Sequence, residues 1–137
     1  LKDFRMLFIA LIPNLIPLIF AGALLGYLGI ELEAGISIVF AVVFGIAVDD
    51  TIHFLSRYKI SRSEGHSVEK SLEITFKETG KAIIFTTIIL FFGFLIMLFS
   101  DNPATNTVGL LISITLASAV VCDLILLPVV MRKVLKS

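Results

Sequence analysis

The sequence predicts an all-α integral membrane protein, a bundle of four transmembrane helices with an amphipathic interfacial helix in the middle cytoplasmic loop. Three observations predict this fold class. Hydrophobic residues make up 58% of the 137 positions and charged residues only 16%, whereas a soluble domain is roughly half apolar and a quarter charged. The mean hydropathy is +1.05. The apolar residues lie in four long runs, each near the roughly 20 residues that a membrane-spanning helix needs.

The four runs are predicted to span the membrane at about residues 6–30, 35–56, 82–100 and 104–131. Helices are preferred because the runs are long and unbroken, whereas the strands of a membrane barrel are short and alternate in polarity. The first run contains two prolines, which a packed membrane helix can tolerate. They suggest either a kink in this helix or a helix start near Asn14.

Residues 57–81 form the polar segment between the second and third spans. Ser67 is a suitable N-cap for a short helix, because its hydroxyl can accept a hydrogen bond from the first turn. Apolar residues then recur every four positions and form one stripe, which comprises Val68, Leu72 and Phe76. We expect this amphipathic helix to lie at the membrane interface and to end at Gly80.

The basic residues predict the topology. All of them lie before the first span, within residues 57–81 or after the fourth span. The charged residues of the two remaining loops are all acidic, and they are Glu31, Glu33 and Asp101. The positive-inside rule therefore places both ends of the chain and the polar segment in the cytoplasm. The formal net charge is zero, so nothing in the charge balance indicates a nucleic-acid partner.

Asp49 and Asp50 are the most informative residues, because they follow about fifteen uncharged positions within the second span. A carboxylate in the hydrocarbon region costs on the order of 2.5–3.5 kcal/mol on insertion scales, so such residues face a protein interior or a water-filled path. Burial and a neighbouring carboxylate both disfavour the ionised form. We therefore expect at least one of the two to take up and release a proton inside the membrane.

Several other residues are candidates to assist this pair. His53 follows Asp49 by four residues, so it could extend a proton path or cap the cytoplasmic end of the helix. Gly45 precedes Asp49 by four residues and predicts the close approach of a neighbouring helix. Thr86 and Thr87 could bind the carboxylates from across the bundle, although buried threonine hydroxyls often bond to their own helix instead.

Asp123 is a secondary intramembrane acid, in the fourth span. If it lies near the cytoplasmic interface, Arg132 or Lys133 could reach back and pair with it, which predicts a structural role. Its neighbour Cys122 is the single cysteine, which excludes an intramolecular disulfide and argues against a cysteine-based metal site.

The run Gly45-Ile-Ala-Val-Asp49-Asp50-Thr-Ile-His53-Phe-Leu resembles the GxxxDD signature of the resistance–nodulation–division (RND) superfamily. It is most similar to the branch that holds the MMPL-type exporters of lipids and hydrophobic compounds, and it also resembles Patched-like and sterol-sensing proteins. Further stretches are similar in the same order, at residues 11–17, 79–87, 93–95 and 123–128. The resemblance covers nearly the whole chain.

This resemblance implies that the chain forms helices three to six of one half of a larger transporter. Its partners would be the lipid bilayer, the remaining helices, the porter domains and a hydrophobic or lipid substrate. Export would be driven by the proton-motive force, with protons as the coupling ion and no other cofactor. Asp49 and Asp50 would be the proton relay, with Thr86 and Thr87 as hydroxyl partners. The location would be the cytoplasmic (inner) membrane. Alone, the fragment is expected to be unstable or to form a homo-oligomer.

Two other classes of function remain as alternatives. A sterol-sensing-like module would bind lipid or act as a scaffold without transport. An enzyme is disfavoured, because an aspartyl protease needs two facing carboxylates, whereas adjacent residues point about 100° apart on a helix. Asp123 is expected at a different depth from the pair. A zinc site needs three or four ligands, and the histidine other than His53, which is His66, lies in the polar segment.

Overall fold

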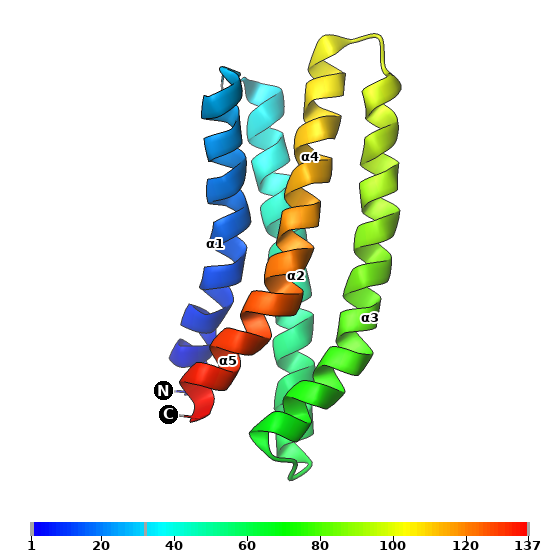
Figure 1. The fold of residues 1–137 in the computed structure, drawn as a ribbon. Coiled ribbons are helices and arrows are strands. Elements are labelled where there is room, and N and C mark those ends of the chain that lie inside the picture. The colour runs from blue at the N-terminus through cyan, green and yellow to red at the C-terminus, as the bar shows by residue number, and fades with distance from the viewer. Residues whose placement is uncertain (1, 32, 137) are drawn as a thin grey trace.

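A computed structural model describes residues 2–31 and 33–136, and Figure 1 shows long helices that lie side by side in a bundle. The helices are α1 (Lys2–Leu28), α2 (Ala34–Ser63), α3 (Val68–Leu95), the 3-10 helix η1 (Ile96–Phe99), α4 (Pro103–Val121), the π-helix η2 (Cys122–Leu126) and α5 (Leu127–Lys136). Four stretches are long and apolar enough to cross a membrane, and they are Phe4–Leu28, Ala34–Ser63, Val68–Phe99 and Pro103–Val134. The predicted all-α fold with four membrane-spanning helices is therefore confirmed.

The helix ends follow from local sequence. Gly29 has a φ of +68° after α1, and the Ile30 N–H donates to the Leu25 carbonyl oxygen over 3.0 Å, which closes the helix in a Schellman-type ending. The predicted N-cap of α3 is present, because the Ser67 hydroxyl accepts a hydrogen bond from the Lys70 N–H. These two devices set where α1 ends and where α3 begins.

The first helix does not begin near Asn14, so the second of the two alternatives for the prolines was wrong. It is continuous from Lys2 and contains Pro13 and Pro17, both of which are buried. Each proline leaves one backbone carbonyl without its usual donor. Asn14 adds a donor to this part of the backbone, because its Nδ2 donates to the Ala10 carbonyl oxygen over 2.7 Å.

The middle polar segment also differs from the prediction. The expected interfacial helix is not a separate element but the first part of α3, which continues through Gly80, and only residues 64–67 separate α2 from α3. A glycine inside a helix costs only about 1 kcal/mol relative to alanine, so tertiary packing can override it. Gly80 is buried beside Leu124, and a Cβ there would be 3.5 Å from the Leu124 Cδ2 atom.

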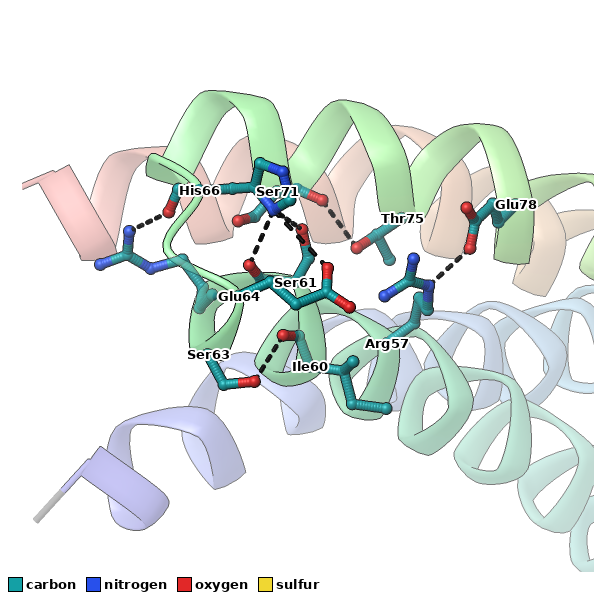
Figure 2. A network of polar contacts seen from close by, with 10 residues as sticks. Arg57, Ile60, Ser61, Ser63, Glu64, His66, Ser71, Thr75 and Glu78 are labelled. Carbon is teal, nitrogen blue, oxygen red and sulfur yellow. Dashed lines mark hydrogen bonds and ion pairs between the residues drawn. The ribbon is translucent and has the colours of Figure 1, made fainter.

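Polar side chains join the ends of α2 and α3, as Figure 2 shows. Arg57 of α2 donates to the carboxylate of Glu78 on α3. At the turn itself, the His66 Nδ1 atom lies 3.1 Å from the Ser61 carbonyl oxygen and 3.6 Å from the Glu64 carboxylate. The Arg57–Glu78 pair thus joins α2 to α3, and the contacts of His66 hold the turn against the end of α2.

The core consists of two apolar clusters separated along the bundle. The first cluster comprises Ile9, Phe54, Tyr58, Leu72, Ile83, Leu127 and Met131. The second comprises Leu25, Ile36, Val39, Val43, Leu111, Ile112 and Leu116. In sequence, three buried polar residues fall between the members of these clusters on their own helices, and they are Asn14, Thr51 and Asp123. The start of α1, the end of α5 and the α2–α3 turn lie at the same end of the bundle (Figure 1).

Candidate functional site

An open pocket of about 510 Å³ lies between α2 and α3, and it brings together most of the residues that the sequence singled out. Its polar lining consists of Asp49, Asp50, His53, Ser56 and Arg57 from α2 and of Glu78, Thr79 and Thr86 from α3. The predicted acidic pair therefore borders an accessible space rather than a closed core. Carboxylates beside a histidine in such a space are groups that can bind and release protons.

The two adjacent acids have different surroundings. The Asp49 side chain is 69% exposed, and its Oδ1 lies 3.5 Å from Nε2 of His53, which is equally exposed. Asp50 is half-buried on the neighbouring face of α2. The spacing of four residues thus brings His53 to Asp49, as the sequence suggested, whereas Asp50 is turned toward the interior of the bundle.

The two threonines of α3 are placed differently from each other. Thr86 lines the pocket, but its hydroxyl donates to the carbonyl oxygens of Ala82 and Ile83 over 3.1 and 3.0 Å. Thr86 therefore follows the alternative in which the hydroxyl bonds to its own helix. Thr87 is buried and does not line the pocket.

Gly45 is not approached by any helix within the described chain, because a Cβ placed there would meet no atom within 4 Å. It lies on the same exposed face of α2 as Asp49 and His53. The close approach occurs instead at Gly109 of α4, where a Cβ would lie 2.6 Å from the Cβ of Met97. The sequence offered no signal for this position beyond the glycine itself.

Asp123 is buried inside the bundle, and the predicted pair with Arg132 or Lys133 is not formed. Its side chain is 1% exposed, and its Oδ1 lies 3.1 Å from the Thr51 hydroxyl of α2. Both basic residues are exposed, and neither forms an ion pair with Asp123 in the part of the chain that the structure describes. Asp123 thus contacts the residue next to Asp50, so its depth is close to that of the acidic pair.

Asp123 lies at the start of the π-helix η2, four residues after the buried Ala119, so the ordinary helical repeat turns it inward. Pro128 has no N–H, and its ring conflicts with the carbonyl four residues earlier in a regular helix. The chain responds with a wider turn, in which the Leu127 N–H donates to the Cys122 carbonyl oxygen five residues back. Figure 1 shows α5 leaving this turn at an angle to α4. Such wide turns are frequent at functional sites.

Thr51 and Asn14 are the interior residues that sequence reasoning missed. The Thr51 Oγ1 lies 3.3 Å from Asn14 Oδ1 and 3.1 Å from Asp123 Oδ1, so it joins α1, α2 and η2. A weak signal existed, because Asn14 is a polar amide inside an uncharged run and Thr51 directly follows the acidic pair. Among residues 2–31 and 33–136, no group of three or more His, Cys, Asp or Glu side chains is placed to hold a metal ion.

Comparison with known proteins gives a consistent result. The family model described as the MMPL family matches residues 15–134. A protein of Methanocaldococcus jannaschii that is named as a membrane protein is 30% identical over 118 residues, which are 86% of this chain. The chain spans only 30% of the length of that relative. No solved structure matches the chain.

Proposed function

Because the chain belongs to the MMPL family, we propose that it is the transmembrane part of an RND-type exporter driven by the proton-motive force. Membership of this family indicates a membrane transport module rather than an enzyme. The substrates are lipids or other hydrophobic or amphiphilic compounds. Asp49 and Asp50 form the proton relay, and protons are the coupling ion.

The observation that carries the proposal is the position of the acidic pair beside an open pocket, directly after the uncharged first half of a helix long enough to span a membrane. A proton carrier must exchange protons with water, so water must reach it. Its charge must also act on the surrounding protein, so it must be partly buried. Asp49 is exposed and Asp50 is half-buried, so the pair combines these two properties. Each proton bound there neutralises a charge that is costly inside a membrane.

The exposed face of α2 supports the presence of further partners. Gly45, Asp49 and His53 lie on this face, and charged groups are costly against lipid tails. Helices from outside this chain, or a water-filled path, therefore cover the face in the working protein. The relative from Methanocaldococcus jannaschii is long enough to supply such helices, since this chain covers 30% of it.

The proposed orientation places the α2–α3 turn and both ends of the chain in the cytoplasm. The α2–α3 turn and the end of α5 lie at the same end of the bundle. Arg62 is in the last turn of α2 and Arg132 is in α5, whereas the α1–α2 and η1–α4 loops at the opposite end contain Glu31 and Asp101. This distribution follows the positive-inside rule. The host membrane is the cytoplasmic (inner) membrane.

The test replaces Asp49 and Asp50 by Asn, singly and together, in the full-length protein reconstituted in vesicles. Efflux of a fluorescent amphiphile is followed after a pH gradient is imposed, once normal insertion of each variant has been verified. We expect the double variant to lose gradient-driven efflux. Asp101→Asn is the matched control, because Asp101 is exposed in the loop between η1 and α4 and should leave efflux unchanged.

Unchanged efflux in the double variant would contradict the proposal. The acids would then be structural, and the alternative of a sterol-sensing-like module that binds lipid without transport would be preferred. That alternative has its own readout, because lipid binding to such a module persists after the pH gradient is collapsed.

A further inference from the structure

The Thr51 hydroxyl lies within hydrogen-bonding distance of three oxygen atoms. Its Oγ1 is 2.9 Å from the Ala47 carbonyl oxygen, 3.1 Å from Asp123 Oδ1 and 3.3 Å from Asn14 Oδ1. A hydroxyl has one hydrogen to donate and can otherwise only accept. Thr51 can therefore satisfy one of these contacts well, and a second contact needs a hydrogen from its partner.

Asn14 and Ala47 cannot supply that hydrogen. The Nδ2 of Asn14 donates to the Ala10 carbonyl oxygen over 2.7 Å, so the amide turns its acceptor oxygen toward Thr51. The Ala47 atom is a backbone carbonyl oxygen, which only accepts. Asp123 is the remaining partner, and a carboxyl group can donate only when it is protonated.

The surroundings of Asp123 favour the same state. Its side chain is 1% exposed, and within the described chain its Oδ2 has no hydrogen-bond partner. Thr51 and Asn14 are equally enclosed, at 1% and 3% exposure. An ionised carboxylate away from water is strongly disfavoured unless a cation or several donors compensate it. Neither kind of compensation is present among the described residues.

We infer that Asp123 is a proton-binding site separate from the Asp49–Asp50 pair. The bound proton makes Asp123 a carboxylic acid that donates to Thr51 Oγ1, while Thr51 donates to Ala47 or Asn14. When the proton leaves, the Thr51 hydrogen turns to the carboxylate, and Asn14 Oδ1 loses its donor. The proton thus decides whether Thr51 can link α2 to both α1 and η2 or to η2 alone. The use of this proton in transport rests on the proposed function, whereas its binding does not.

The titratable neighbours of Asp123 are few. From α2, Asp50 lies close enough to interact with it electrostatically, and from η2 its neighbour Cys122 does so as well. From α1 the facing polar group is the uncharged Asn14, and α3 brings Gly80 against η2. Because two nearby carboxyl groups influence each other's titration, protonation of Asp50 at the pocket and protonation of Asp123 affect each other.

The test is infrared spectroscopy of the full-length protein in lipid vesicles over a series of pH values. A protonated carboxyl group gives a carbonyl band that is distinct from the bands of a carboxylate. We expect such a band at neutral pH in the wild type and in Asp50→Asn, and its loss in Asp123→Asn. A band that persists unchanged in Asp123→Asn would overturn the inference. Efflux is not needed for this readout, so a failure here is distinguishable from a failure of the proposed exporter.

Two further measurements keep the inference testable. If Asp123→Asn does not insert, Thr51→Val is measured in its place. Loss of the hydroxyl should shift the carbonyl band of the Asp123 acid, and an unshifted band would overturn the inference.

Since the same oxygens could hold a sodium ion, thermal unfolding is compared in sodium chloride and choline chloride at constant pH. We expect equal midpoints. A midpoint that is higher in sodium chloride, and loses this difference in Asp123→Asn, would establish a cation site and overturn the proton site.

Discussion

Arg57 of α2 donates to Glu78 of α3, with 2.5 Å between Nε and Oε2, and both side chains line the pocket that contains the acidic pair. The carboxylate is 57% exposed and the guanidinium 25%. Ion pairs in such settings contribute about 0–1 kcal/mol, because water competes for both charges. The pair therefore fixes how α2 and α3 face each other more than it stabilises the bundle.

The Arg57–Glu78 pair should show a small coupling energy. We expect a double-mutant cycle with Arg57→Gln and Glu78→Gln to give less than about 1 kcal/mol in the free energy of unfolding. Urea unfolding in detergent micelles measures it. A coupling energy well above this value would mean that the pair is shielded from water in the assembled protein.

Gly109→Ala should destabilise the bundle by about 1–3 kcal/mol, the usual cost of an overpacked core position. The added methyl group would lie 2.6 Å from the Met97 Cβ and 2.9 Å from the Phe94 carbonyl oxygen, and neither atom is the end of a flexible side chain. The measurement is the thermal unfolding midpoint in detergent. Gly22→Ala is the control, because it faces open space and should be neutral or stabilising.

Thr51→Val should cost about 1–3 kcal/mol, because it leaves buried polar partners unsatisfied. Thr115→Val is the matched control, since Thr115 is equally buried but its hydroxyl bonds only to the Leu111 carbonyl oxygen of its own helix. Chemical unfolding of both variants gives the comparison. Equal losses would mean that the contacts of Thr51 with Asp123 and Asn14 contribute no stability.

The pocket should be accessible to water. In a Cys122→Ser background, we expect cysteines at Ser56 and Thr79, which line the pocket from α2 and α3, to react with a water-soluble maleimide in intact vesicles. A cysteine at the buried Ser113 should not react. The measurement is the labelled fraction by mass spectrometry. Equal reactivity at all three positions would contradict the distinction between pocket and core.

Thr86→Val should leave gradient-driven efflux unchanged, because the Thr86 hydroxyl is already bonded to the backbone of its own helix. The measurement is the same vesicle efflux assay that tests the Asn variants of Asp49 and Asp50. A clear loss of efflux in a normally inserted Thr86→Val would show that the hydroxyl turns toward Asp49 or Asp50 during the cycle, as the family resemblance implies.

The spans could be predicted because membrane helices are encoded locally. A run without charges, such as that between Ala82 and Ser100, has few stable alternatives in lipid. The prediction that a helix ends at Gly80 was wrong, because it considered only the small helix penalty of glycine and not the residue that packs against Gly80 in the fold. Leu124 lies 44 positions later in the sequence, and no periodicity shows that it packs there.

The interior of the candidate site was less predictable. The acids were found because charge in an apolar run is conspicuous, but Thr51 and Asp123 are 72 residues apart and their contact depends on how α2 and η2 face each other. Asp123 continues the buried repeat of Leu116 and Ala119, but the hydropathy of this uniformly apolar run does not show which side of the helix faces α2. For the same reason, sequence could not decide between Gly45 and Gly109 as the point of close approach.

The second span was predicted to end near residue 56, but α2 continues to Ser63. This extra length has a mechanical consequence. A helix of 30 residues is about 45 Å long, whereas the hydrocarbon core of a bilayer is about 30 Å thick. The paired ends of α2 and α3 therefore form a stiff arm that stands roughly 15 Å beyond the lipid tails. A tilt of α2 within the bilayer would displace the tip of this arm at Gly65. A probe attached there would report, from the aqueous phase, on motions around the acidic pair.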